Sequence, residues 1–186
     1  MKNILPEGVE CIFVRQPEQL GLGHAILCAE RAIGAEPFAV LLADDFLIGE
    51  ASGTTADLIS AFIATGKTQL SSMEVAGPDI CNYGVIIPGD SPRAVSGLGE
   101  KPKAEDAPSN LASIGRYVLN HSIFETLRGL EAGAGGEIKL AAPSTLRRDV
   151  AQLRLCPSRA SVSIVEVSQA TSTQFLRSPA GVSPQS

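Results

Sequence analysis

An uninterrupted apolar run that stops at two aspartates is the feature that most constrains this 186-residue chain. Residues 38–43 are all apolar, and Asp44 and Asp45 follow them directly. A short continuous apolar run is typical of a strand buried on both faces, as in a parallel sheet covered by helices, and ligands bind beyond the carboxyl ends of such strands. The pattern therefore predicts a site for a divalent metal and a phosphate-bearing substrate near Asp44. The alternative is that the two carboxylates cap the next turn or end a strand in solvent.

The composition indicates a globular protein with one sizeable core. Hydrophobic residues make up 44% of the chain and charged residues 19%. The net charge of −5 argues against a general nucleic-acid surface. No apolar stretch reaches the length of a membrane span, and the N-terminus does not resemble a signal peptide. The four cysteines lack the spacing of metal ligands, and Cys11 and Cys28 lie within apolar segments, so we expect these two to be small core thiols in a reduced, cytoplasmic protein.

Apolar periodicity and turn signals predict alternating strands and helices. The expected strands are residues 10–16, 38–44, 69–75, 82–87 and 111–119, and the expected helices are residues 24–33, 54–65 and 122–130. Strand, helix and strand in succession over residues 10–44 predict a right-handed βαβ unit. The expected fold is therefore α/β, with a mixed, mainly parallel sheet flanked by helices.

The Gly-Leu-Gly-His segment at residues 21–24 is the second informative feature. Glycines at the start of a helix let a ligand approach the backbone, where free amides favour anions or carbonyl oxygens. Neither a GxGxxG fingerprint nor a GxxxxGK[ST] loop is present, so an ordinary strand-to-helix turn is the alternative. His24 is either a catalytic residue or, as we favour, a hydrogen-bonding residue near the helix start.

Two features in the second half of the chain each allow two interpretations. Gly84 could bring a backbone amide against a ligand, or it could permit a bulge. Glu100 and Lys101 could accept sugar hydroxyls and neutralise a phosphate. They could also be an exposed charge pair, which the composition favours.

Taken in order, these motifs resemble the bacterial UTP–glucose-1-phosphate uridylyltransferase family. The resemblance extends over about residues 3–140 and agrees in kind, order and spacing. The matching segments are residues 14–16, 21–25, 37–45, 83–85, 99–103, 107–112, 114–119 and 133–138. It implies a Rossmann-like nucleotidyltransferase fold and a transferase of nucleotide-sugar biosynthesis. Such an enzyme uses Mg²⁺ to transfer a uridylyl group from UTP to glucose 1-phosphate, giving UDP-glucose and pyrophosphate.

The resemblance also implies roles for individual residues around the nucleotide. Gln16 would contact the uracil edge, and Gly21 and Gly23 would form the turn that closes over the base. Asp44 would hold the catalytic Mg²⁺. Asp45 receives less weight because its position varies in the family.

On the sugar side, the resemblance implies that the backbone of Gly84 meets the hexose. Glu100 would bind glucose hydroxyls, and Lys101 would pair with the sugar phosphate. The implied reaction is in-line attack by the glucose 1-phosphate oxygen on the α-phosphorus of UTP. Positioning and charge neutralisation by the metal and by lysines such as Lys101 would carry the rate.

Both ends of the chain depart from the family pattern. The family begins with a strand and a Gly-x-Gly-Thr-Arg loop that wraps the triphosphate, and its second metal ligand lies in an Asp-Cys-Gly-x-Lys motif; neither is present here. We therefore expect residues 1–140 to form a partial nucleotidyltransferase domain truncated at its N-terminus. Residues 141–186 would be a divergent, partly disordered tail. Residues 164–168 can be back-translated so that a shifted frame reads Asp-Cys-Gly-Ser-Lys, and sequencing the gene tests this frameshift hypothesis.

Two classes of function stay open. The first is a UTP–glucose-1-phosphate uridylyltransferase, whose turnover we expect to be weak or absent in this fragment. The alternative is a non-catalytic remnant, or half of a split protein, that keeps residual sugar-phosphate binding through Glu100 and Lys101. The expected partners are UTP and glucose 1-phosphate, with no nucleic acid and no membrane, and a homo-oligomer is left open.

Overall fold

The computed structural model describes residues 8–47, 53–91 and 93–130, residues 138 and 140, and the backbone of residues 154–155 and 163–164. In this part of the chain the helices are α1 (Gly21–Ile33), α2 (Thr54–Thr65) and α3 (Ile123–Arg128), with the 3₁₀ turns η1 (Gly77–Asn82) and η2 (Ala104–Asp106). The strands are β1 (Phe38–Leu41), β2 (Asp45–Phe46), β3 (Gln69–Glu74), β4 (Gly84–Pro88), β5 (Val95–Glu100), β6 (Leu111–Leu119), β7 (Arg154–Leu155) and β8 (Ser163–Ile164).

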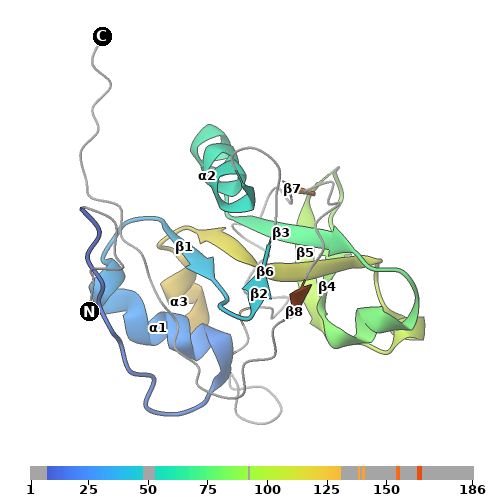
Figure 1. Cartoon of the computed structure of the whole chain (residues 1–186), viewed down its shortest axis with the longest axis horizontal. Coiled ribbons are helices and arrows are strands. Elements are labelled where there is room, and N and C mark those ends of the chain that lie inside the picture. The colour runs from blue at the N-terminus through green and yellow to red at the C-terminus, as the bar shows by residue number, and fades with distance from the viewer. Residues whose placement is uncertain are drawn as a thin grey trace.

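The main sheet is built around β6, its longest strand (Figure 1). β3 pairs along one edge of β6. β1 and β4 share the other edge: Phe38 of β1 lies opposite Leu119, and Val85 of β4 lies opposite Ala112. β5 extends the sheet beyond β4, and β7 extends it beyond β3. β2 and β8 form a separate two-stranded ribbon.

The predicted α/β class is confirmed, but the prediction of a mainly parallel sheet is wrong. β1, β3 and β4 each run antiparallel to β6, and β4 and β5 form an antiparallel hairpin. Among the described strands, only β3 and β7 form a parallel pair. β1 and β3 do point the same way, with α2 between them in the chain, but β6 is inserted between them in the sheet. A strand buried on both faces has the same apolar pattern in either orientation, so the sequence could not reveal this insertion.

The predicted strand at residues 10–16 does not form. Between residues 8 and 20 the structure has only a single bridge, at Ile12, and the side chains of Ile12 and Phe13 are 46% and 82% exposed. The predicted right-handed βαβ unit over residues 10–44 therefore lacks its first strand. An extended apolar segment becomes a strand only when a neighbouring strand satisfies its backbone hydrogen bonds, and composition alone does not supply that neighbour.

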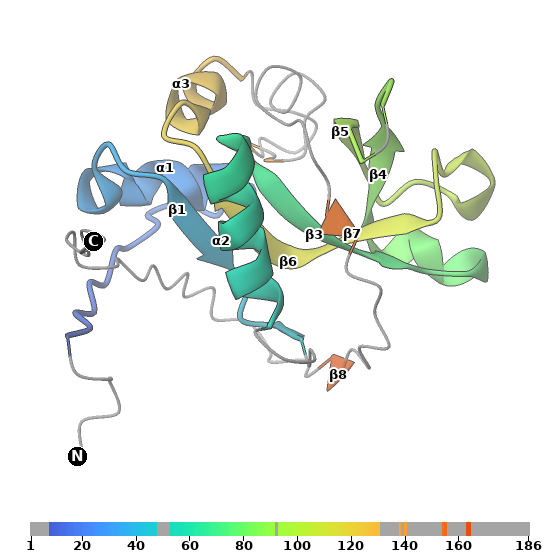
Figure 2. The same ribbon diagram turned by 90° about the horizontal axis from the view of Figure 1, so that it is seen from above.

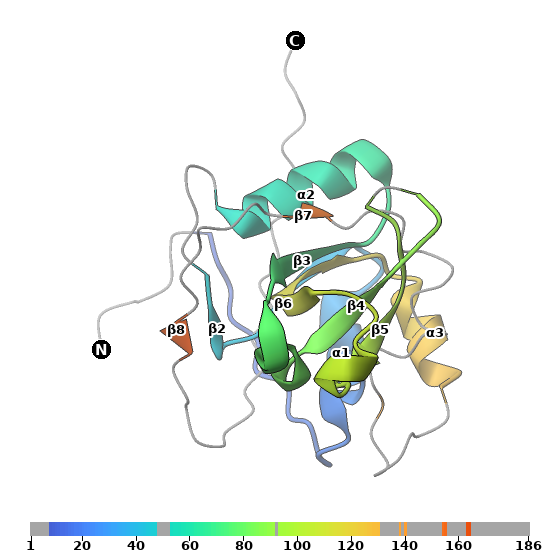
Figure 3. The ribbon, with the colours of Figure 1, turned by 90° about the vertical axis from the view of Figure 1, so that its right-hand side faces the viewer.

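Helices cover both faces of the sheet (Figure 3). α1 and α3 contact each other on one face, and α2 packs on β3 and β6 on the opposite face. The core under α1 and α3 includes Phe124, which is fully buried and stacks on Phe38 with 5.3 Å between the ring centroids. Other buried members of this core are Ile26, Ala29, Ile33, Val40, Leu70, Ile86, Leu98, Tyr117, Leu119, Ile123 and Leu127.

The hairpin of β4 and β5 and the turn η1 lie at the end of the sheet away from α1 (Figure 2). A smaller cluster of Ile80, Val85 and Ala112 packs there. The tail predicted for residues 141–186 lies outside the described residues except for β7 and β8. Within the described residues, no helix is long and apolar enough to cross a membrane.

Candidate functional site

The turn after β1 carries Asp44 and Asp45. The N–H of Leu42 donates to the carbonyl oxygen of Gly115 at 2.9 Å, which continues the pairing with β6 beyond the end of β1. Asp44 is exposed, whereas Asp45 is half-buried. The side chain of Asp45 lies against Gly115, since a Cβ added there would come within 2.2 Å of Asp45 Oδ2. Only glycine at position 115 leaves room for this carboxylate, and Asp44 is the carboxylate that faces solvent.

Arg116 of β6 holds this turn at both ends. Its Nη1 donates to the carbonyl oxygens of Leu42 (3.0 Å) and Gly115 (2.9 Å). Its Nη2 donates to the carbonyl oxygen of Asp45 at 2.7 Å. Leu42 and Asp45 flank the position of Asp44, so one guanidinium closes the turn that carries the exposed carboxylate. We call this set of three hydrogen bonds the Arg116 clamp.

The two adjacent aspartates repel each other. Burial and the charge of Asp44 raise the pKa of Asp45, although the backbone of Gly115 and the guanidinium of Arg116 act in the opposite direction. Burial lowers the pKa of Arg116 against the attraction of Asp45 and Asp44. A cation beside these carboxylates would relieve the repulsion between them.

We expect the substitution Asp45→Asn to stabilise the folded chain at neutral pH. Because the pKa of Asp45 is raised above 3.8 on folding, the folded chain holds the proton more tightly than the unfolded chain. Stability is therefore lost as the pH rises from the ordinary pKa through the raised one. Asparagine remains neutral and can still accept a hydrogen bond from Gly115. Urea unfolding should show the gain at pH 7 and none at pH 3, and a variant that is less stable at both pH values would contradict this account.

The hairpin of β4 and β5 brings together the three residues assigned to the sugar. Gly84 lies opposite Glu100, and the N–H of Lys101 donates to the carbonyl oxygen of Tyr83 at 3.1 Å. The side chains of Glu100 and Lys101 are exposed. Lys101 has φ +40°, in the left-handed region that residues with a side chain rarely adopt. Such strained residues cluster at ligand sites, so this geometry favours the functional interpretation of Lys101.

Gly84 has no structural need for glycine in the described part of the chain. Its φ is not positive, and an added Cβ would meet no atom within 4 Å. The bulge alternative does not hold, because the irregularity of β4 falls between Ile87 and Pro88 rather than at Gly84. A bare stretch of backbone that opens onto free space is what a closely approaching ligand requires.

Tyr117 of β6 is a buried residue whose pKa is influenced by the turn that carries the two aspartates and by the hairpin assigned to sugar binding. Its hydroxyl forms a hydrogen bond with Ser113 Oγ at 3.2 Å. Burial raises the pKa of Tyr117; the hydrogen bond from Ser113 acts in the opposite direction, and the charges of Asp45, Glu100 and Asp44 make smaller contributions that also raise it. The turn after β1 adjoins Gly115, and β4 meets the same edge of β6 at Ala112, so the end of β1 and the β4–β5 hairpin border neighbouring residues of β6.

Gln16 lies against the start of α1. Its Nε2 donates to the carbonyl oxygen of Gly21 at 3.1 Å and lies 3.1 Å from His24 Nδ1. The same ring nitrogen lies 3.1 Å from the carbonyl oxygen of Glu18, and His24 Nε2 lies 3.7 Å from Cys28 Sγ. The interpretation of His24 as a hydrogen-bonding residue near the helix start is therefore confirmed.

Gly23 packs closely against the backbone of Ile138. Its N–H donates to the carbonyl oxygen of Ile138 at 2.9 Å, and the N–H of Ile138 donates to the carbonyl oxygen of Leu20 at 2.8 Å. A Cβ on Gly23 would come within 2.6 Å of the Ile138 oxygen, so this approach requires glycine. The amide of Gly23 is thus occupied, contrary to the free helix-start amides that were expected. That the turn at Gly21 and Gly23 closes over a base stays a prediction.

Four residues of β6 escaped the assignment of roles from sequence: Ser113, Gly115, Arg116 and Tyr117. Three of them belong to a matching motif at residues 114–119, but the motif attached no role to them. One signal was available, since an arginine within a largely apolar strand must find partners when it is buried.

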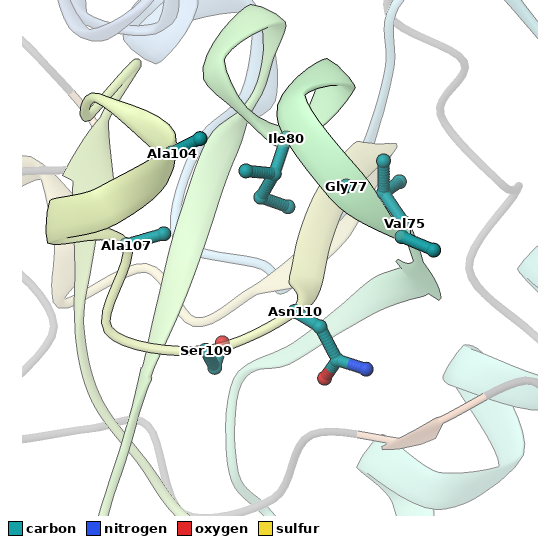
Figure 4. Close-up of a pocket in the computed structure, with 8 residues that line it drawn as sticks. Val75, Gly77, Ile80, Ala104, Ala107, Ser109 and Asn110 are labelled. Carbon is teal, nitrogen blue, oxygen red and sulfur yellow. The ribbon is translucent and has the colours of Figure 1, made fainter.

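A groove of about 410 Å³ lies between η1 and η2 (Figure 4). Its lining residues are Val75, Ala76, Gly77, Ile80, Ala104, Ala107, Ser109 and Asn110. None of the residues assigned a role from sequence lines it, so the groove is distinct from the candidate site.

The sequence model of the nucleotidyl transferase family matches residues 2–155. A UTP–glucose-1-phosphate uridylyltransferase of Bacillus subtilis (strain 168), YngB, is 45% identical over 131 residues, which cover 69% of this chain and 44% of the relative. The UDP-glucose pyrophosphorylase structure from Acinetobacter baumannii has a TM-score of 0.74 at 32% identity. The match covers 87% of this chain and 57% of the chain in that structure. A UDP-glucose pyrophosphorylase complexed with UDP-glucose has a TM-score of 0.72 at 35% identity, over 80% and 58% of the two chains. The chain spans about half the length of the curated relatives that it matches.

Proposed function

Because this chain belongs to the nucleotidyl transferase family, we propose that its site binds UTP and glucose 1-phosphate and supports uridylyl transfer between them. The products would be UDP-glucose and pyrophosphate. The observation that carries the proposal is that the turn bearing Asp44 adjoins Gly115, while the β4–β5 hairpin bearing Glu100 and Lys101 meets the same edge of β6 at Ala112. The names of the curated relatives and the UDP-glucose complex of a structural neighbour support this choice of substrates.

The sugar phosphate would bind at the β4–β5 hairpin. Glu100 accepts hydrogen bonds from the sugar hydroxyls, because an ionised carboxylate is an acceptor only. Lys101 supplies a positive charge for the phosphate, and Gly84 leaves the backbone open for the hexose. These residues hold the attacking oxygen of glucose 1-phosphate in line with the α-phosphorus of UTP.

The proposed metal is Mg²⁺, and Asp44 would hold it. The donor chemistry fits, since Mg²⁺ takes carboxylate oxygens and completes its shell with substrate phosphates and water. The electrostatics fit too, because burial and the charge of Asp44 raise the pKa of Asp45, and a cation would offset the repulsion between the two carboxylates. When bound, the ion supplies charge neutralisation for the phosphates.

The chain's own residues would contribute by positioning. Gln16 and the turn at Gly21 and Gly23 hold the base, and Lys101 holds the sugar phosphate. The Arg116 clamp fixes the turn on which Asp44 stands. Little covalent chemistry falls to the protein in such a transfer, so fixed geometry and fixed charges carry the rate.

Pyrophosphate release from UTP and glucose 1-phosphate in the presence of Mg²⁺ tests the proposal. Calorimetric binding of UDP-glucose to the full chain accompanies it, together with circular dichroism to establish folding. We expect binding, with turnover that is weak. A folded chain that binds neither UTP nor UDP-glucose and releases no pyrophosphate would overturn the proposal.

Binding without turnover is the second candidate function. The observation that favours it is the small donor set: within the described residues, no group of three or more His, Cys, Asp or Glu side chains could hold a metal ion. A chain that binds UDP-glucose and turns over no substrate would select this candidate.

We expect the substitution Gly84→Ala to weaken UDP-glucose binding by about tenfold while changing the unfolding free energy by less than about 0.5 kcal/mol. The added methyl group meets no protein atom and occupies the space assigned to the hexose. Gly99→Ala is the matched control, because a Cβ there makes only ordinary contacts, the nearest at 3.8 Å. Calorimetry should distinguish the two variants, and equal affinities would contradict the role of Gly84.

Two further expectations concern the whole protein rather than the site. The expected cytoplasmic location rests on the cysteines, which are scattered and suggest reduced thiols. Cell fractionation tests this location. Assembly into a homo-oligomer is tested by light scattering on the purified chain.

A further inference from the structure

We propose that His24 is a positioning residue that fixes the side-chain amide of Gln16, so that Gln16 presents its oxygen Oε1 to the nucleobase. The inference rests on the proposed function, because it takes Gln16 as the residue at the base. His24 itself need not touch the nucleotide.

The orientation of the Gln16 amide follows from its contact with Gly21. The carbonyl oxygen of Gly21 can only accept a hydrogen bond, so the Gln16 atom 3.1 Å away must be the nitrogen Nε2. One of the two hydrogens on Nε2 is thereby used. The oxygen Oε1 is directed away from Gly21.

The second hydrogen on Nε2 faces the imidazole of His24. Nδ1 of His24 lies 3.1 Å from Nε2 and can accept this hydrogen only when the ring proton is on the other nitrogen. That proton then faces Cys28 Sγ, a weak acceptor 3.7 Å away. This tautomer satisfies both hydrogens of the Gln16 amide within the protein, at the cost of leaving the Nδ1 lone pair 3.1 Å from the carbonyl oxygen of Glu18, which can only accept.

A second tautomer of His24 competes with the first. If Nδ1 carries the proton, it donates to the carbonyl oxygen of Glu18 at 3.1 Å. Nδ1 then has no lone pair for Gln16, and the amide of Gln16 loses its second anchor. The positioning role therefore belongs to the tautomer with an unprotonated Nδ1.

The fixed amide has a consequence for base selection. With both Nε2 hydrogens occupied, Gln16 offers only an acceptor. Uracil has an N–H donor at ring position 3, where cytosine has an unprotonated nitrogen. Two acceptors that face each other both remain unpaired, and a site built to accept a hydrogen bond rejects a base that lacks the donor. An anchored Gln16 therefore favours uracil over cytosine.

The tautomer of His24 can be measured in the ligand-free chain. Nitrogen-15 NMR of the imidazole should show an unprotonated Nδ1 and a protonated Nε2. A protonated Nδ1 would overturn the inference whatever the chain binds.

Calorimetric binding of UTP and of CTP, with Mg²⁺ present, tests the consequence. His24→Leu should reduce the preference for UTP over CTP by about threefold to tenfold, the effect of one lost hydrogen bond. His24→Asn, whose side-chain oxygen can accept near the position of Nδ1, should restore most of that preference. Arg31→Leu, at an exposed position of α1, is the control and should retain it. The thermal midpoint of each variant establishes that it folds.

A double-mutant cycle separates positioning from a general structural role. In the Gln16→Ala background, His24→Leu should have no further effect on the UTP-to-CTP ratio, because His24 acts through Gln16. Additive effects would overturn the inference, as would an equal loss of UTP and CTP affinity in His24→Leu.

The outcomes also distinguish this inference from the proposed function. A wild-type chain that binds no uridine nucleotide refutes the proposed function, and base recognition by Gln16 with it. A wild-type chain that prefers UTP, with the same preference in His24→Leu, refutes the positioning role alone.

Discussion

Replacing Arg116 with methionine should lower the free energy of unfolding by about 2–4 kcal/mol, because three charge-assisted hydrogen bonds are lost and their acceptors remain. Methionine keeps much of the volume and removes the charge. The carbonyl oxygens of Leu42 and Asp45 lose their common donor, and the turn between them is no longer closed. We also expect the affinity for UDP-glucose in the presence of Mg²⁺ to fall by about tenfold or more, since the turn carries Asp44.

Arg128→Met is the matched control for this experiment. Arg128 forms an ion pair with Glu30, but its side chain is 53% exposed. Exposed ion pairs contribute only about 0–1 kcal/mol, so this variant should remain close to wild type. Arg116→Lys keeps the charge without the planar fork and should fall between the two. Urea unfolding of the three variants measures the differences, and equal effects at positions 116 and 128 would remove the case for the clamp.

Asp44→Asn should abolish Mg²⁺-dependent function while leaving the fold intact. The side chain of Asp44 is exposed, so we expect the free energy of unfolding to change by less than about 0.5 kcal/mol. Loss of the proposed metal ligand should reduce any pyrophosphate release by at least about 100-fold. In calorimetry, the affinity of the variant for UDP-glucose should no longer respond to Mg²⁺.

Asp90→Asn controls for the change in net charge, because Asp90 is an exposed aspartate beyond the end of β4. It should retain the response to Mg²⁺. Asp45→Asn provides a sharper comparison, since its carboxylate lies against Gly115 rather than in solvent. If Asp45→Asn lost the response and Asp44→Asn kept it, the metal ligand would be Asp45.

Local sequence patterns predicted the elements that depend on local information. The strand at residues 111–119 is β6, with the predicted bounds, and the helix expected from residue 24 is α1, which begins at Gly21. Residues 10–16 also contain an apolar run, at residues 11–14, and still formed no strand. The difference lies in the available partner, because β6 finds neighbours on both edges. The prediction of strand direction failed for the same reason, because the direction depends on which strand lies between β1 and β3 in the sheet.

The candidate site divides in a similar way. Asp44 and Gly84 could be singled out because each ends or begins a strand that the sequence predicts, whereas Glu100 was singled out with Lys101 as a charge pair and its strand, β5, was not predicted. The Arg116 clamp could not, because its acceptors Leu42 and Asp45 lie 74 and 71 positions away in the sequence. The obstruction of position 115 by the Asp45 carboxylate is likewise a contact between distant segments. Residue types and spacing do not reveal contacts between segments that are far apart in the sequence.

The contact between Gly23 and Ile138 has a consequence for biosynthesis. These residues lie near opposite ends of the matched region, yet their backbones are hydrogen-bonded to each other. During translation, α1 emerges from the ribosome long before Ile138, so the hydrogen bond from the N–H of Gly23 can form only after Ile138 has been synthesised. The turn assigned to the base would then be completed only after the sheet strands have been synthesised. A nascent chain would thus complete the start of α1 only late in its synthesis, after the strands of the sheet.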